Sequence, residues 1–437
     1  MKFREIIDSP CGIRYLFDAL ELQSGYARIV LLDREMMTSP EEIAASYASL
    51  RHYIALVRED RRKVEDLQFH LQGLRDIRST LASLSEGIVL DEIELFEIKH
   101  LALLADKLGS GRDMTQVIEI LDPDGLRIGT FYLYDSYSPQ LRRLRSLVEQ
   151  DPDDPDLRED LLNEEDRIKQ LLSSKLQPLA EDLRETLSAL AELDIVLAKA
   201  LQFVKEGLVI PEIGSSSLIK GMFHPEIKSV LKNHGRDFEP VDFDFRLGVT
   251  STVIGANMGG KTVVLKTLCM MQLLFQFGFA VPAESVVMMP FDDIRFCIGD
   301  EQDEKRGLSS FAAEMRRIDR LIEAVDSGVR VLGLVDEPAR TTNPVEGSAL
   351  VEALLKRLSD KDNLALVMTT HYTVANSGQC WKVKGLLPGT GGRKMDYRLE
   401  KTSDNEVPHE ALNIARELSI DSRWIEIADT IMKRQYE

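Results

Sequence analysis

The sequence lacks long apolar runs and has few cysteines. No apolar run reaches the roughly 18 residues that a membrane-spanning helix needs, so we expect no membrane span. The N-terminus, MKFREIIDSPCGIRYLF, has no continuous apolar segment of the kind that a secretory signal carries. We therefore expect a reducing, cytoplasmic location and free thiols. The cysteines, which have no metal-ligand spacing, are Cys11, Cys269, Cys297 and Cys380.

Basic charge is also scarce. The chain has 54 Lys and Arg against 73 Asp and Glu, which gives a net charge of −19. This excess of negative charge disfavours non-specific attraction to nucleic acid, although an acidic protein can still carry one basic groove. The rest of the composition, with 44% hydrophobic and 29% charged residues, is ordinary for a soluble globular protein. A length of 437 residues predicts two or three domains.

Helical patterns dominate residues 1–207. Apolar residues recur at three- and four-residue steps over 40–87, 91–109, 157–172 and 176–207. Periodic patterns longer than about 25 residues depart from globular norms. They favour an antiparallel lever arm within a helical core and lever domain, with an ordinary helical bundle as the alternative.

Two segments interrupt this helical pattern. The stretch 117-VIEILDPDGLRIGTFYLY-134 places β-branched and aromatic residues around a DPDG turn, which predicts a small hairpin near 117–134. The stretch 151-DPDDPD-156 cannot continue a helix, because it holds two prolines and four aspartates. We expect the helices on either side of it to fold back on one another.

The pattern changes from residue 208 onward. Short β-rich runs at 249–254, 284–289, 330–336 and 364–370 alternate with helical patterns, which predicts an α/β domain with a largely parallel, buried sheet. The predicted fold class is therefore α + α/β, with an all-helical domain over 1–207 followed by a P-loop NTPase domain over 208–437.

The P-loop prediction depends on 255-GANMGGKT-262, which follows an apolar run and opens a helical pattern. Its spacing, G-x-x-x-x-G-K-T, lets backbone N–H groups surround phosphate, and the helix adds its positive end. Lys261 would contact the β- and γ-phosphates, and the Thr262 hydroxyl would hold Mg²⁺. The predicted nucleotide-binding residues of the loop are Gly255, Asn257, Met258, Gly259, Gly260, Lys261 and Thr262.

Two later strand patterns end in polar residues. The run 331-VLGLVDEPAR-340 places Asp336 where P-loop enzymes hold Mg²⁺ and Glu337 where a general base can polarise the attacking water. The run 364-LALVMTTHY-372 brings His371 to the carboxyl end of its strand, where parallel sheets bind ligands. We expect His371 to contact the γ-phosphate or the water.

A helical pattern begins at Ser309 and Ser310. The N–H groups at such a helix start can bind an anion. The alternative is a simple N-cap, because serine is a favoured cap residue.

The strings GANMGGKT, SSFAAEM, LGLVDEPAR and MTTHY resemble, in order, the P-loop, signature, magnesium and histidine motifs of the MutS family of ATPases. The resemblance implies an ABC-type ATPase domain over 208–437 with a C-terminal helical dimerisation segment, and ATP and Mg²⁺ as cofactors. It also implies a dimer, either with itself or with a similar MutS-like subunit. In such a dimer Ser309 would act on the partner's γ-phosphate, Asn257 would lie near the γ-phosphate and the attacking water, and Phe238 would stack on adenine.

The chain departs from the family pattern in several places. Ala256 replaces a proline of the usual P-loop, and 339-ARTTNP-344 replaces a glycine-arginine-glycine-threonine pattern, so we assign Arg340 no role. We expect neither a mismatch-reading domain nor the nuclease-like domain of the MutS2 branch. The lever tip also lacks the strand-containing clamp of DNA-binding relatives. Residues 149–166 hold ten Asp or Glu and one Arg, a composition that repels a phosphate backbone.

These features lead to two functional hypotheses. The first is an ATP-driven remodelling factor for a protein partner. Small clamp-less members of the family resemble the reactivating factors of cobalamin-dependent lysine or ornithine aminomutases, which makes an aminomutase the expected client. The alternative is an ATPase that binds mismatched or structured DNA in repair or recombination, supported by basic clusters at 58–63 and 140–145. The identity of the client, the composition of the dimer and the contacting face of the lever stay open.

Overall fold

The structure is a computed structural model of the whole chain. It describes all residues except 129, 131, 256–259, 300–309, 373–377, 387–394, 403–420 and 437, and it describes only the backbone of 310, 385, 386, 395 and 432–436. Contacts within the chain form two compact units. The helical unit comprises residues 20–34 and 49–204, and the α/β unit comprises residues 1–19, 35–48 and 205–437. None of the helices in the described part of the chain combines the length and apolarity that crossing a bilayer requires.

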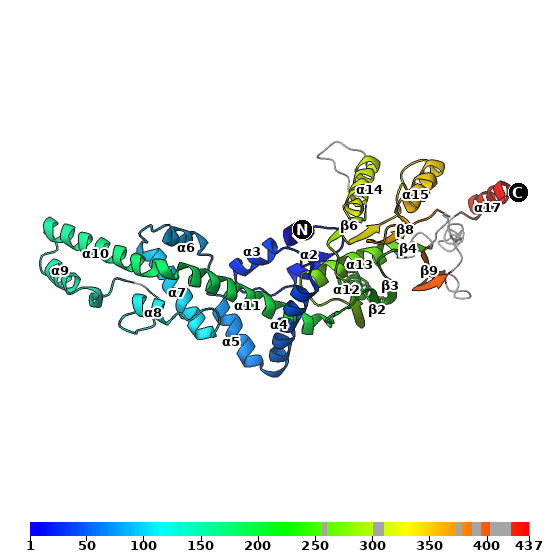
Figure 1. The fold of residues 1–437 in the computed structure, drawn as a ribbon. Coiled ribbons are helices and arrows are strands. Elements are labelled where there is room, and N and C mark those ends of the chain that lie inside the picture. Colours follow the sequence, from blue (N-terminus) through cyan, green and yellow to red (C-terminus); the bar gives the residue numbers. More distant parts are fainter. Residues whose placement is uncertain are drawn as a thin grey trace. The chain divides into compact units, whose positions relative to one another are not determined.

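The helical unit consists of α-helices joined by short connections (Figure 1). Within it, α9 and α10 lie side by side and contact each other. Its elements are α3 (Gly25–Asp33), the later part of α4 (Pro40–Glu59), α5 (Arg61–Leu71), α6 (Arg78–Ser85), α7 (Glu92–Leu108), α8 (Thr115–Leu121), η1 (Asp135–Tyr137), α9 (Pro139–Gln150), α10 (Pro155–Leu176), η2 (Gln177–Leu179) and most of α11 (Ala180–Glu206).

The α9–α10 hairpin follows from the capping residues at its helix starts. Ser138 accepts hydrogen bonds from the backbone N–H groups of Gln140 and Leu141, and Asp154 caps α10 in the same way. Proline is the first residue of both helices, where its missing N–H costs nothing. Residues 151–154 are the whole connection, as the DPDDPD break predicts.

The segment 117–134 differs from the predicted hairpin. Val117, Ile118 and Leu121 are buried at three- and four-residue spacing, so Thr115–Leu121 forms helix α8. Burial at the helical period outweighs the β propensity of these residues. No strand lies among the described residues of 122–134. Instead, Lys99 Nζ bonds to Asp122 Oδ1 at 3.1 Å and to the Tyr134 hydroxyl at 2.7 Å, which ties both ends of the segment to α7.

The α/β unit contains two sheets. The larger has the strand order β10-β9-β4-β8-β7-β6, in which only β10 is antiparallel to its neighbour, and the smaller has the order β1-β5-β2-β3. The elements are α1 (Phe3–Ile6), α2 (Ile13–Asp18), β1 (Glu212–Ile213), β2 (Ser217–Met222), α12 (Pro225–Asn233), β3 (Val241–Phe245), β4 (Val249–Ile254), α13 (Lys261–Gln276), β5 (Ser285–Met288), β6 (Asp293–Cys297), α14 (Ser310–Asp326), β7 (Val331–Val335), α15 (Pro344–Leu358), β8 (Leu364–Thr369), β9 (Gln379–Leu386), β10 (Met395–Thr402) and α17 (Ser422–Tyr436).

Two N-terminal segments, 1–19 and 35–48, pack in the α/β unit, whereas the sequence pattern groups them with the helices of 1–207. The centroid of the Phe3 ring lies 5.1 Å from the ring centroid of Phe277 and 5.7 Å from that of Phe279. The Tyr47 hydroxyl donates to the backbone oxygens of Phe275 and Phe279. These long-range contacts join the beginning of the chain to the end of α13.

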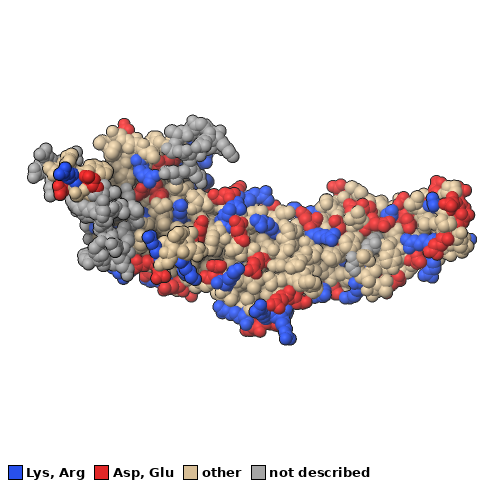
Figure 2. Space-filling view, turned by 180° about the vertical axis from the view of Figure 1, so that it is seen from behind, with Lys and Arg blue, Asp and Glu red and all other residues tan. Residues whose placement is uncertain are grey.

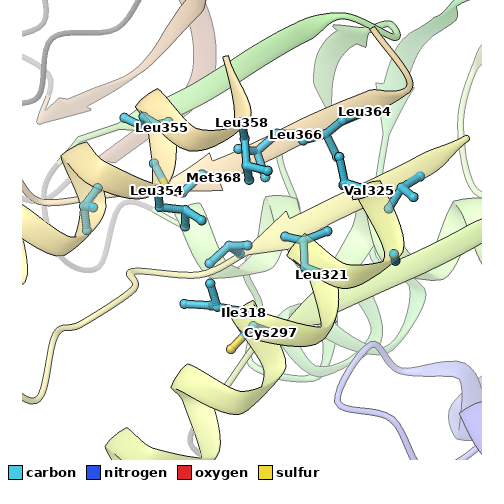
Figure 3. Packing of buried hydrophobic residues seen from close by; sticks show 14 residues of the cluster. Cys297, Ile318, Leu321, Val325, Leu354, Leu355, Leu358, Leu364, Leu366 and Met368 are labelled. Carbon is cyan, nitrogen blue, oxygen red and sulfur yellow. The ribbon is translucent and has the colours of Figure 1, made fainter. Parts of the chain in front are cut away.

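A buried aliphatic core holds α14 and α15 against β7 and β8 (Figure 3). Leu321 and Val325 of α14 meet Leu354 of α15 and Leu366 and Met368 of β8 in this core. Fully burying each such side chain contributes about 1.5–3 kcal/mol. The core therefore fixes β7 and β8, and with them the positions of the polar residues at their carboxyl ends.

Candidate active site

The sheet order brings three loops to one edge. Strand β8 lies between β4 and β7, and all three are parallel. The carboxyl ends of parallel strands face the same side, so the loops after β4, β7 and β8 meet there. These loops carry the predicted P-loop, the Asp336–Glu337 pair and His371.

The glycines at the two ends of the predicted P-loop have positive φ. Gly255 has φ of +147° and Gly260 has φ of +81°, a region that glycine adopts without strain. A Cβ atom on Gly255 would also lie 3.1 Å from Val383 Cβ. Gly260 is the N-cap of α13, so the first N–H groups of this helix have no acceptor within the helix and point toward the loop that precedes it. The predicted residues Asn257, Met258 and Gly259 lie outside the described residues.

Lys261 connects the P-loop to the acidic pair. Its buried Nζ donates to the Gly255 carbonyl at 2.8 Å and lies 3.2 Å from Glu337 Oε1. The other carboxylate oxygen of Glu337, Oε2, lies 3.6 Å from Arg340 Nη1. The structure therefore brings together two predicted site residues from loops about 75 positions apart in the sequence, and Arg340 joins them.

Thr369, the last residue of β8, orients both acids. Its Oγ1 donates to Asp336 Oδ1 at 2.7 Å and accepts the backbone N–H of Glu337 at 2.9 Å. The Asp336 N–H in turn donates to the Cys297 carbonyl at the end of β6. Glu337 has φ of +42°, an uncommon conformation for a residue with a side chain. Sequence reasoning missed Thr369, although it stands in the MTTHY string two residues before His371.

His371 lies half-buried just after β8, and its ring is 4.0 Å from that of Tyr372. Burial lowers the pKa of His371; Glu337 raises it, and Lys261 and Arg340 lower it. These influences place His371 within electrostatic reach of the Lys261–Glu337 pair. With a lowered pKa, its imidazole is neutral near pH 7 and can donate one hydrogen bond and accept another.

A pocket of about 250 Å³ opens beside Gly260. Phe238, half-buried, lines it together with Tyr397 of β10 and the aliphatic side chains of α12 and α13. Glu239 Oε2 accepts the Tyr397 N–H at 3.1 Å, which ties β10 to the loop that carries Phe238. A flat, apolar base can lie in such a pocket next to a phosphate-binding loop. Tyr397 was not predicted, because no local motif marks it.

The oxygen donors of the site suit Mg²⁺. Thr262 follows Lys261 at the start of α13, and Asp336 precedes Glu337. The contact between Lys261 and Glu337 therefore brings Thr262 and Asp336 to the same part of the site. Hydroxyl and carboxylate oxygens are hard ligands of the kind this ion prefers. Among the residues that the structure describes, no group of three His, Cys, Asp or Glu could hold a metal alone. A Mg²⁺ ion here would therefore also need nucleotide phosphate oxygens, as is usual for this metal.

Ser309 lies outside the described residues. The structure describes only the backbone of Ser310, the first residue of α14. The predicted action of Ser309 on a partner's nucleotide stays a prediction.

Comparison with known proteins assigns the central part of the α/β unit. Residues 251–382 match the family model of MutS domain V, which is an ATPase domain and implies ATP binding. Endonuclease MutS2 of Thermus thermophilus is 35% identical over 217 residues, which are 48% of this chain and 27% of that protein. Endonuclease MutS2 of Caldicellulosiruptor saccharolyticus is 37% identical over 213 residues, 47% of this chain and 26% of that protein. The matched part thus spans about a quarter of the length of these curated relatives.

Proposed function

We propose that this chain hydrolyses ATP and uses the nucleotide cycle to move its helical unit against a protein partner. The observation that carries the proposal is the α9–α10 hairpin. Its four-residue connection, 151–154, has no room for a clamp built of strands. Residues 149–166 hold ten Asp or Glu and one Arg, and that Arg158 lies 3.7 Å from Asp153. Such a tip offers a duplex no cations to replace its counterions.

The geometry supports a role for each predicted residue around the P-loop. Lys261 would exchange its contact with Glu337 for the β- and γ-phosphates, which leaves Glu337 available to polarise the attacking water. Asp336, held by Thr369, and Thr262 would hold Mg²⁺, which neutralises developing phosphate charge when bound. His371 would contact the γ-phosphate or the water.

The remaining roles concern the base and the partner subunit. The pocket that Phe238 and Tyr397 line supports adenine stacking on Phe238. Asn257 would lie near the γ-phosphate. Ser309 would act across a dimer interface, formed with a second copy or with a similar MutS-like subunit.

The client is the finer part of the proposal. The resemblance to reactivating factors of cobalamin-dependent aminomutases makes such an aminomutase the first client to test. The proposed location of both proteins is the cytoplasm. ATP-dependent release of inactivated cobalamin from the purified aminomutase is the measurement. Release that needs ATP and stops with Lys261→Ala supports this client; release that is independent of the ATPase contradicts it.

The alternative is a DNA-binding ATPase. It is favoured by the curated relatives of the ATPase half, which are named endonucleases. Basic clusters at 58–63 and 140–145 could contact phosphate, but Arg145 lies 2.8 Å from Asp135 and 3.1 Å from Glu165, and Arg61 lies 2.8 Å from Glu65. Carboxylates so close reduce the attraction of these cations for DNA.

Fluorescence anisotropy with labelled duplex, mismatched and branched DNA at low salt separates the two functions. The wild type and Glu337→Gln should be compared with and without Mg²⁺-ATP, because the variant should bind ATP and hydrolyse it slowly. We expect ATP hydrolysis by the wild type and no tight DNA binding by either protein. Tight binding that weakens steeply with added salt would overturn the proposal in favour of the alternative.

A further inference from the structure

The helical unit exposes three aliphatic side chains within six residues. Ile88 and Val89 lie in the loop between α6 and α7 and are 50% and 46% exposed, and Ile93 in the first turn of α7 is 68% exposed. We call these three residues the aliphatic ridge. Single exposed aliphatic residues are common on protein surfaces, but a group of branched ones close together marks an interaction site more often.

Hydrogen bonds hold the ridge in its exposed position. The Ile88 N–H donates to the Ser83 carbonyl at 3.0 Å, and the Leu90 N–H donates to Ser173 Oγ of α10 at 2.9 Å. Leu90 itself is fully buried, so it anchors the loop between the exposed Val89 and the start of α7. Asp91 then caps α7 by accepting the Glu94 N–H. The loop is thus fixed at both sides of the ridge.

Carboxylates flank the ridge along the chain. Glu86, Asp91 and Glu92 are exposed within the same eight-residue stretch. On the adjoining face of α10, Lys169 Nζ lies 3.0 Å from Asp166, and the pKa of Lys169 is raised by Asp166 and also by Glu92. Lys169 is therefore already paired, and so is Arg184, which contacts Ser85 beside the ridge and lies 2.9 Å from Glu181. Figure 2 shows acidic side chains gathered at the end of the helical unit formed by α9 and α10.

The charge around the ridge selects among possible partners. The carboxylates beside the ridge form an acidic rim. This rim repels phosphate backbones and anionic lipid surfaces, because these are also negatively charged and are attracted by Lys and Arg. A protein segment with apolar residues on one side and Lys or Arg beside them complements both the ridge and its rim.

We propose that the aliphatic ridge is a docking surface for a basic, amphipathic segment of the protein partner. The inference rests on the proposed function, because it assumes that the partner is a protein. The apolar side chains of the segment would cover Ile88, Val89 and Ile93. Its cations would meet Glu86, Glu92 and their neighbours, which favours association at low salt.

The test uses a fluorescein-labelled 18-residue peptide of Leu and Lys in a helical heptad pattern, with anisotropy as the readout. The triple variant Ile88→Ser/Val89→Ser/Ile93→Ser should bind it at least tenfold more weakly than the wild type. The matched control is Leu126→Ser/Ile128→Ser/Tyr132→Ser, which removes side chains of similar exposure, 51%, 38% and 43%, elsewhere in the same unit. The control should bind within twofold of the wild type.

Two further arms make the result decisive. Glu86→Gln/Glu92→Gln should weaken binding at low salt and have less effect at high salt, and a peptide with Glu in place of Lys should not bind. The single variant Ile93→Ser, at the most exposed position, gives an independent measure if the triple variant melts early. Equal affinity of the ridge variants and the wild type, or equal losses in the ridge and control variants, would overturn the inference.

The same preparations separate this inference from the proposed function. If ATP is hydrolysed and DNA is not bound, but the peptide ignores the ridge, then only the docking surface is wrong. If DNA is bound tightly, the protein-remodelling function fails whatever the peptide does.

Discussion

Thr369 has a hydroxyl that contacts both acids of the site. Because Oγ1 donates to Asp336 and accepts from the Glu337 N–H, the isosteric change Thr369→Val removes both contacts without changing the volume of the side chain. We expect kcat for ATP to fall about 10- to 100-fold, as for other residues that orient ligating or catalytic groups. The affinity for nucleotide should change much less, because Lys261 and the P-loop are untouched.

The control for Thr369 is Thr369→Ser, which keeps the hydroxyl. It should retain most of the wild-type kcat, as measured by steady-state phosphate release with nucleotide affinity determined in parallel. A Thr369→Val protein with normal turnover would show that Asp336 and Glu337 need no orientation from β8.

His371 provides a prediction for pH. Its folded-state pKa is lowered, first by burial, from an ordinary value of about 6.5. As the pH falls through that ordinary value, the unfolded chain takes up a proton on His371 that the folded chain does not. The stability contributed by neutral His371 is therefore present above the ordinary pKa and is lost progressively as the pH falls from there to the folded-state pKa. For catalysis, the neutral imidazole should persist to a lower pH than a free histidine would allow.

The measurement is kcat for ATP between pH 5 and 8 in the wild type and in His371→Gln. The wild type should keep its activity to below the ordinary pKa of histidine and then lose it, whereas His371→Gln should be about 10- to 100-fold slower and lack that acid loss. Identical pH profiles for the two proteins would remove His371 from the reaction.

At the scale of elements, Glu164 joins the two helices of the acidic hairpin. It lies on α10, and its carboxylate accepts from Ser138 Oγ, the cap of α9, at 2.6 Å, and from Arg167 at 2.7 Å. The bond from Arg167, with help from Ser138, lowers the pKa of Glu164 to about 2. Stability from this carboxylate is therefore present above its unfolded pKa of about 4.5 and is lost as the pH falls toward about 2.

The variant Glu164→Gln tests this tie between helices. It should destabilise the helical unit by about 1–3 kcal/mol near pH 7, because Arg167 and Ser138 lose a charged acceptor. As the pH falls from about 4.5 toward about 2, the difference from the wild type should shrink. Urea unfolding at several pH values, followed by circular dichroism, measures both effects, with exposed Glu159→Gln as the control. A difference that stays constant with pH would contradict the assignment.

The elements that the sequence could predict are those with a local cause. The P-loop glycines, the acids after β7 and the break before Pro155 each follow from the conformation or spacing of adjacent residues. The segment 117–121 was predicted as part of a hairpin because it is rich in β-branched residues. Such a short apolar segment is also compatible with a helix, and only its burial against neighbouring helices decides between the two structures.

Long-range contacts account for what the sequence could not predict. Tyr397 reaches the pocket beside Gly260, and Glu239, which accepts its N–H, stands 158 residues away in the sequence. Tyr47 joins the α/β unit through carbonyls 228 and 232 residues further along the chain. No sequence motif encodes such pairings. The sequence pattern therefore predicts neither that Tyr397 lines the pocket nor that the segments 1–19 and 35–48 belong to the α/β unit.

At the scale of the whole molecule, the decisive prediction concerns assembly. If Ser309 acts on the nucleotide of a partner, one chain alone holds an incomplete site, and ATP should favour two chains together. Glu337→Gln in Mg²⁺-ATP should accumulate this state, because binding persists while hydrolysis is slow. Light scattering should then give about twice the chain mass of 49.3 kDa.

The controls separate dimerisation through nucleotide from simple self-association. Lys261→Ala should not bind ATP and should keep the same mass with and without it. Ser309→Ala should bind ATP and yet hydrolyse it slowly, and mixing it with Lys261→Ala should restore some turnover only if one chain's serine serves the other chain's nucleotide. In that mixed dimer the Ser309→Ala subunit supplies a complete P-loop and the Lys261→Ala subunit supplies the serine, so about one site in two is intact. Wild-type turnover by Ser309→Ala, or no recovery in a mixture that does dimerise, would mean that each chain hydrolyses ATP without its neighbour, and the shared site would have to be abandoned.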